Sequence, residues 1–169
     1  MLTEKMSLAL NDQLNAELAS SYTYLSLAAH FGAQSLPGLA HWFRTHAEEE
    51  QVHAMKIFDY ILARGGTVTL AAVPAPPAPA ASPREAFADA FREESEVSGA
   101  IDALVEVAVA EKDRATQVFL DWFVTEQVEE EALFSELLTQ INRIGDSEVG
   151  LFVFDQKLAE RTPDTSGGD

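Results

Sequence analysis

The chain contains no cysteine among its 169 residues. This absence excludes disulfides, thiolate zinc sites, cysteine-ligated iron–sulfur clusters and cysteine nucleophiles. Any metal ion in this protein would therefore be held by oxygen and imidazole ligands.

Positive charge is scarce, because 11 Lys and Arg face 28 Asp and Glu, and the formal net charge is −17. Such a charge repels nucleic acid and anionic lipid and attracts cations, so we expect no nucleic-acid or membrane partner. A merely acidic surface explains the charge equally well.

Long apolar runs are also missing. No stretch of about 18 apolar residues occurs, which argues against a membrane-spanning helix. The segment Met1-Leu2-Thr3-Glu4-Lys5 lacks the apolar core of a signal peptide. We therefore expect a cytoplasmic protein.

Helical periodicity is present in four long segments. The first runs from about Thr3 to Phe31 and is expected to stop before Gly32. After a tight connection at Gly32 to Gly38, the second runs to Arg64, before Gly65-Gly66. The short link makes these two helices antiparallel neighbours. The segment Thr67 to Ala81 contains four prolines, which predicts an extended crossover.

The second half of the chain predicts two further long helices and a short one. Ser82-Pro83-Arg84-Glu85 is typical of a helix start, and periodicity continues to Ile144. We place a bend near Lys112-Asp113. A fifth helix, capped by Asp146 or Ser147, should reach about Arg161. The prediction is an all-α four-helix bundle over residues 1–161, with a long crossover between the second and third helices and a polar, disordered tail over 162–169.

Each predicted long helix carries an acid within its apolar stripe. On the second helix, Glu50 and His53 form a Glu-x-x-His whose spacing puts both side chains on one face. The other interruptions are Glu17, Glu94, Gln127 and Glu130. Antiparallel packing should bring these residues to one level of the bundle. Burying bare carboxylates is costly, so this convergence predicts a bound cation.

The charge of this set selects the ligand. Four carboxylates, Glu17, Glu50, Glu94 and Glu130, would balance two divalent cations, with His53 as a neutral ligand. Carboxylate-rich sites with one imidazole suit iron or manganese, and zinc competes for them. Glu50 lies at the centre of the set and is the expected bridge between the two ions.

Each residue has a simpler explanation when taken alone. Glu17 resembles a solvated helix residue, and an isolated Glu-x-x-His is often an exposed capping or ion-pair motif. Tyr24 is typical of packing, and Glu129-Glu130-Glu131 of a solvated face. His46 is predicted to be a hydrogen-bonded core histidine rather than a ligand. Acids at matching positions on four helices are improbable by chance, so we favour the metal site.

The combined pattern resembles bacterial non-heme ferritins over nearly the whole chain. The resemblance is carried by Glu17, Tyr24, Glu50-x-x-His53, Glu94 and Trp122-Phe123-Val124-x-Glu126-Gln127-x-Glu129-Glu130. It implies a homo-oligomeric hollow shell of 24 subunits. Each subunit would be a ferroxidase that oxidises Fe(II) with O2 or peroxide at a diiron centre, and the shell would store a ferric mineral.

The resemblance also implies roles for these residues. The first iron would bind Glu17, Glu50 and His53, and the second Glu50, Glu94 and Glu130. Gln127 would lie beside the irons or face oxygen, and Tyr24 would donate a hydrogen bond near the centre or supply an electron. A third iron would bind Glu49, Glu126 and Glu129, unless these acids simply coat an acidic inner wall.

Departures from related families narrow the prediction. Heme-binding bacterioferritins carry a second Glu-x-x-His on the fourth helix and a methionine after the second-helix glutamate. This chain has no histidine at 129 or 130 and has Gln51 after Glu50, so no heme is expected.

Three rival functions stay open. A DNA-protecting miniferritin would lack the fifth helix, and the acidic charge disfavours DNA. A substrate-oxidising diiron enzyme would carry a second Glu-x-x-His. A metal-free structural bundle would leave the buried acids unexplained.

Overall fold

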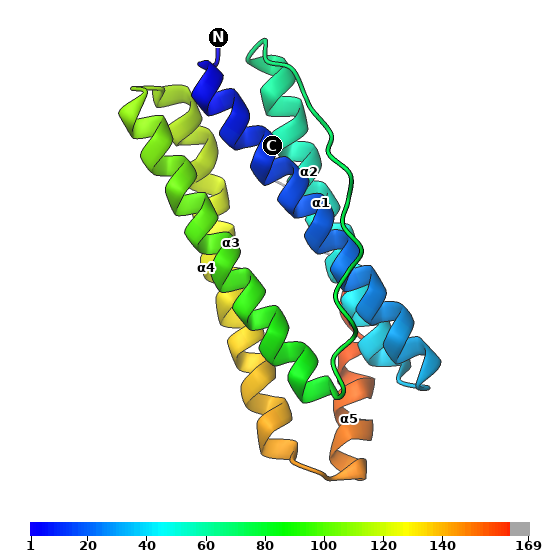
Figure 1. Cartoon of the computed structure of the whole chain (residues 1–169). Coiled ribbons are helices and arrows are strands. Elements are labelled where there is room, and N and C mark those ends of the chain that lie inside the picture. The colour runs from blue at the N-terminus through cyan, green and yellow to red at the C-terminus, as the bar shows by residue number, and fades with distance from the viewer. Residues whose placement is uncertain (163–169) are drawn as a thin grey trace.

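The computed structural model describes residues 1–162, and within them the chain forms five helices and no strand. The helices are α1 (Glu4–Ala33), α2 (Pro37–Ala63), α3 (Pro83–Ala110), α4 (Arg114–Ile144) and α5 (Glu148–Leu158). Figure 1 shows α1 and α2 as one antiparallel pair, α3 and α4 as the other, and α5 packed at one end of the bundle. The predicted all-α class, helix order and short fifth helix are confirmed. Of the predicted disordered tail, residues 163–169 lie outside the described residues.

Side chains cap four of the helix starts. The cap side chains accept hydrogen bonds from backbone N–H groups of the first turn, which have no partner inside the helix. The caps are Thr3, Ser82, Asp113 and Ser147. The predicted break near Lys112-Asp113 is confirmed, because Lys112 takes a φ of 56° and Asp113 caps α4.

Three predicted helix ends were wrong by a few residues. Helix α1 continues through Gly32 to Ala33, and α2 begins at Pro37 rather than after Gly38. Proline fits the first turn of a helix, because its missing N–H would have no partner there. The positive φ of the connecting turn, 59°, falls on Ser35. Helix α5 ends at Leu158, before the predicted Arg161.

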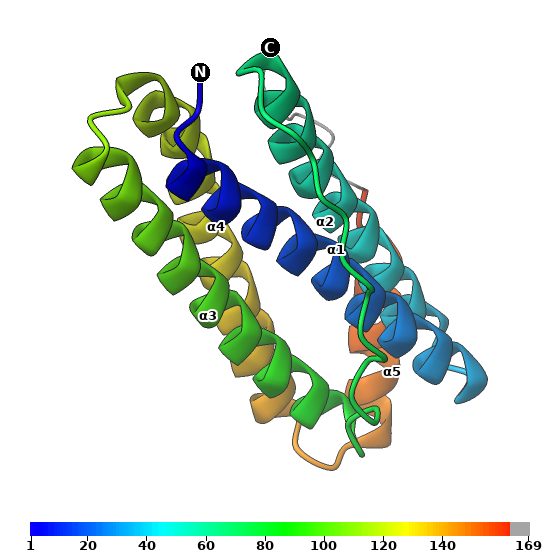
Figure 2. The ribbon, with the colours of Figure 1, turned by 45° about the horizontal axis from the view of Figure 1, so that its top comes forward.

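The crossover runs back along the α1–α2 pair in an extended conformation, as Figures 1 and 2 show. Two asparagines of α1 fix its first part. The Nδ2 of Asn11 donates to the Thr67 carbonyl at 3.0 Å, and its Oδ1 accepts the Thr69 N–H at 2.6 Å. One turn later, Asn15 donates to the Thr69 carbonyl at 2.9 Å and accepts the Ala71 N–H at 2.8 Å. The side chains therefore replace the backbone partners that the extended segment lacks.

Helix α5 docks on the first turns of α2. The Oδ1 of Asp155 accepts a hydrogen bond from the backbone N–H of Leu39 at 2.8 Å. A side chain of α5 therefore satisfies a donor in the first turn of α2 that has no partner within that helix. The two backbones approach closely at Gly38, where a Cβ atom would lie 1.6 Å from the Asp155 carbonyl oxygen. This docking brings Arg161, three residues beyond α5, alongside α2.

The core consists of two apolar clusters. One is centred on Phe43, Phe87 and Phe134, and the other contains Leu14, Ile57 and Phe123. Buried polar side chains of all four long helices occupy the positions between these clusters along each helix. No helix in the described part of the chain is long and apolar enough to cross a membrane.

Candidate metal centre

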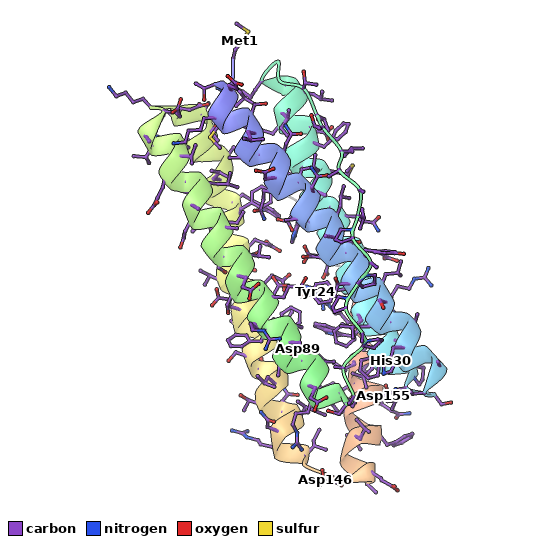
Figure 3. All side chains as sticks on the ribbon, viewed as in Figure 1. Met1, Tyr24, His30, Asp89, Asp146 and Asp155 are labelled. Atoms are coloured by element: carbon purple, nitrogen blue, oxygen red, sulfur yellow. The ribbon has the colours of Figure 1, made fainter. Side chains whose placement is uncertain are left out.

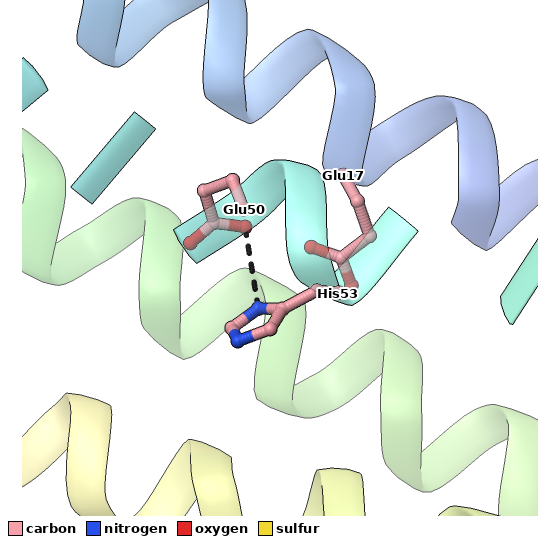
Figure 4. Close-up of side chains that lie close together, drawn as sticks. All are labelled: Glu17, Glu50 and His53. Carbon is pink, nitrogen blue, oxygen red and sulfur yellow. Dashed lines mark ion pairs between the residues drawn. The ribbon is translucent and has the colours of Figure 1, made fainter. Parts of the chain in front are cut away.

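Helices α1 and α2 build the first part of the centre. Glu17, Glu50 and His53 are 2%, 2% and 5% exposed, and each offers a ligand atom within 4.8 Å of the other two. Figure 4 shows Glu17 on α1 facing Glu50 and His53 on α2. The Nδ1 of His53 lies 3.6 Å from Glu50 Oε2, and Gln13 Nε2 donates to Glu17 at 2.8 Å. The three residues predicted for the first iron therefore lie together.

Helices α3 and α4 contribute Glu94, Gln127 and Glu130, all of which are buried. The Tyr24 hydroxyl donates to Glu94 Oε1 at 2.5 Å, and Figure 3 shows Tyr24 inside the bundle between α1 and α3. The Nε2 of Gln127 donates to the backbone carbonyl of Glu94 at 3.2 Å and lies 3.4 Å from its Oε2. Tyr24 and Gln127 therefore both orient the Glu94 carboxyl group.

His46 lies at the centre of the acids. Its Nε2 is 3.3 Å from Glu50 Oε1 and 3.4 Å from Glu94 Oε1. Its Nδ1 is 3.2 Å from Glu49 Oε2 and 3.9 Å from Glu130 Oε2. The prediction of a buried, hydrogen-bonded histidine is confirmed, because the ring is 0% exposed. The sequence analysis missed its central place in the site. The available signal was its spacing, because His46 lies three residues before Glu49 and four before Glu50 on one helix face.

The acids predicted for the second iron meet around this ring. Glu50 and Glu94 form a candidate metal group with His46, and Glu130 belongs to a second group with His46 and Glu49. The imidazole therefore links the acids of α2 to those of α3 and α4.

The acids predicted for a third iron are not gathered into one group in the described residues. Glu49 pairs with Arg161, which the sequence had indicated only as the end of the fifth helix. The Oε1 of Glu126 lies 3.8 Å from His53 Nε2, and Glu129 is exposed. The third site stays a prediction.

Known proteins match this chain over most of its length. The sequence profile of the ferritin-like domain matches residues 7–144. A bacterial non-heme ferritin of Bacteroides fragilis (strain 638R) is 42% identical over 161 residues, which are 95% of this chain and 100% of the relative. The chain belongs to the ferritin family.

Other members of the ferritin family show similar agreement. A bacterial non-heme ferritin of Staphylococcus aureus (strain MRSA252) is 40% identical over 164 residues, covering 97% of this chain and 99% of the relative. The crystal structure of an open-pore ferritin from the archaeon Archaeoglobus fulgidus superposes with a TM-score of 0.95 at 44% identity. That comparison covers 96% of this chain and 100% of the archaeal chain. The predicted resemblance is confirmed.

Two acids of this ferritin-family site have pKa values above that of a solvated glutamate. Burial, followed by the neighbouring Glu50 carboxylate, raises the pKa of Glu17 well above its ordinary value. Burial also raises the pKa of Glu130 to about 7, although the nearby His46 opposes the shift. Both groups therefore hold protons more tightly than a solvated glutamate does.

For His46 and His53, the neighbouring acids together affect the pKa more strongly than burial does. Burial disfavours the charged ring of His53, but Glu126, Glu50 and Glu17 outweigh burial and raise its pKa to about 11. The pKa of His46 is also raised, because Glu130 and the other surrounding acids outweigh burial. Hydrogen bonds from both histidines in turn lower the pKa of Glu50 in spite of its burial. Imidazolium groups therefore balance part of the acidic charge in this structure.

The donor set fits divalent metal ions. Carboxylate oxygens and imidazole nitrogens are the ligands that iron, manganese and zinc accept. Among the described residues, two buried side-chain atoms have no hydrogen-bond partner, and they are Glu130 Oε2 and Arg161 Nη1. The orphaned Glu130 oxygen belongs to a candidate metal group, so a ligand atom is available there.

Proposed function

We propose that this chain is the subunit of an iron-storage ferritin and that it oxidises Fe(II) at the buried centre. The observation that carries the proposal is the layer of acids and imidazoles between two apolar clusters, with contributions from all four long helices. Membership of the ferritin family supports the same function. Iron is the substrate and cargo of this reaction.

The first Fe(II) would bind Glu17, Glu50 and His53, and the second would bind Glu50, Glu94 and Glu130. Glu50 would bridge the two ions. Each Fe(II) would give one electron to O2 or peroxide, and the ferric product would move to the mineral. The protein would supply fixed ligand geometry and negative charge, because the redox chemistry belongs to iron. Tyr24 and Gln127 would hold the Glu94 carboxyl group in place.

Assembly into a hollow shell of 24 subunits completes the proposal. The surface feature that supports assembly is the exposed apolar face of α5, where Val149, Phe152 and Val153 are 75%, 61% and 61% exposed. Exposed apolar patches of this kind mark contact surfaces between proteins. A third iron, the absence of heme and a cytoplasmic location stay predictions.

The test replaces Glu50 and His53 by alanine and follows Fe(II) oxidation by stopped-flow absorbance. Removal of the bridge and the imidazole should abolish rapid oxidation while the assembled particle keeps its size. Glu48→Ala is the matched control, because Glu48 lies on the same helix but its side chain is 55% exposed. Wild-type oxidation rates in the double variant would reject the assignment.

Size-exclusion chromatography after iron loading separates storage from the alternatives. A very large particle that retains many iron atoms per subunit is expected. A detoxifying miniferritin would form a smaller particle, and a diiron oxidase would retain only about two irons per chain.

A further inference from the structure

Arg161 turns back from the end of α5 onto the metal centre. It lies three residues beyond Leu158, the last residue of α5, and its side chain is 16% exposed. The guanidinium lies 4.4 Å from the centre of the Trp42 ring. The Arg161 carbonyl lies 2.8 Å from Nε2 of His41. Contacts of both backbone and side chain therefore fix this residue against α2.

The guanidinium contacts two members of a candidate metal group. Its Nη2 donates to Glu49 Oε2 and lies 3.3 Å from His46 Nδ1. Glu49 and His46 form that group together with Glu130. Arg161 thus places the positive charge of a side chain directly beside this candidate metal group.

Two buried side-chain atoms of this region have no hydrogen-bond partner. Arg161 Nη1 and Glu130 Oε2 are buried without hydrogen-bond partners, and no other described side-chain atom shares this state. A buried donor and a buried acceptor without partners each cost free energy. The contacts of Arg161 are therefore not optimised for stability alone, which favours a role at the metal centre.

A guanidinium stays charged at every physiological pH, and its attachment to the chain keeps it close to Glu49. A metal ion that binds the Glu49 oxygen must break a charge-assisted hydrogen bond and also meet the repulsion of the guanidinium. The described contacts of Arg161 include no such hydrogen bond to Glu17, Glu50 or His53.

We propose that Arg161 is a specificity-determining residue that holds the Glu49 carboxylate and opposes metal binding at the Glu49–His46–Glu130 group. This inference rests on the proposed function of the centre. The arginine makes this group the weaker position and leaves the Glu17–Glu50–His53 group to fill first. It determines how many metal ions each subunit binds tightly.

The test is calorimetric titration of the assembled protein with Zn²⁺, which needs no redox step. Arg161→Gln removes the charge and keeps a polar side chain, whereas Arg161→Lys keeps the charge. Arg143→Gln is the matched control, because it makes the same charge change at an exposed position. Arg161→Gln should tighten the weakest site by about tenfold, or about 1.4 kcal/mol, or add a site. Arg161→Lys and Arg143→Gln should resemble the wild type.

A second substitution tests the link to Glu49. Glu49→Gln in the Arg161→Gln background should remove the gain in Zn²⁺ affinity, because the carboxylate that Arg161 contacts is then absent. Size-exclusion chromatography and thermal unfolding of each variant check assembly and folding. Superimposable Zn²⁺ isotherms for the wild type, Arg161→Gln and Arg161→Lys would overturn the inference while the proposed function stands. A wild type that binds Zn²⁺ as expected but does not oxidise Fe(II) would instead overturn the proposed function.

Discussion

Replacing Gly38 by alanine should detach α5 from the bundle. The added Cβ would lie 1.6 Å from the Asp155 carbonyl oxygen and 2.5 Å from the carbonyl carbon. Both atoms belong to the backbone of α5, so no side-chain rotation relieves the overlap. Helix α5 as a whole would have to move away from α2.

The cost of this movement follows from the contacts that hold α5. Phe154 and Leu158 are each 4% exposed, and each would lose about 1.5–3 kcal/mol of burial energy. The hydrogen bond from the Leu39 N–H to the Asp155 carboxylate contributes about 1.5–3 kcal/mol more. Complete detachment would therefore cost about 4.5–9 kcal/mol, and partial detachment correspondingly less.

Hydrogen exchange and thermal unfolding measure the effect. Amide protons of α5 should exchange much faster in Gly38→Ala, and the melting temperature should fall. Gly99→Ala is the matched control, because a Cβ at Gly99 within α3 meets no atom within 4 Å. That control should stabilise the protein by about 0.5–1 kcal/mol, since alanine favours helix more than glycine does.

Equal protection of α5 in Gly38→Ala and the wild type would refute the reasoning. It would mean that the close approach of α2 and α5 is not required for docking. A destabilised Gly99→Ala would show instead that free space around a glycine does not predict whether alanine is tolerated there.

Two further predictions concern the metal centre. Zn²⁺ binding should release protons and weaken as pH falls, because the acids around His53 raise its pKa to about 11 and the imidazole must lose its proton to bind a metal ion. Titration in buffers of different ionisation enthalpy measures the release, and a heat independent of buffer would contradict it. Tyr24→Phe should cost about 1–3 kcal/mol of stability, because Glu94 loses a buried donor. Chemical denaturation measures this cost, and an unchanged midpoint would argue against a structural role for the hydroxyl group.

Much of the fold followed from local signals in the sequence. Prolines in the crossover, the cap at Ser82 and the break at Asp113 act on the backbone within a few residues, so their effects can be read without a tertiary structure. The same locality explains the errors at Gly32 and Pro37. A glycine permits a helix end but does not require one, and the turn uses Ser35 instead.

The candidate site was predictable for residues that interrupt an apolar stripe. Glu17, Glu50, His53 and Glu94 each interrupt the apolar stripe of their helix, and helix length determines their common level. Periodicity alone therefore indicated which residues are buried together.

Only the tertiary structure decided how those residues pair. His46 lies among acids from three helices, and Arg161 reaches Glu49 across 112 positions of the chain. Such contacts depend on the distance and rotation of packed helices and on the docking of α5, and periodicity carries no information about either. The sequence by itself thus determined a buried layer of acids with an imidazole in a helical bundle. The packing of the helices decided that His46 joins those acids and that Arg161 reaches Glu49 beside them.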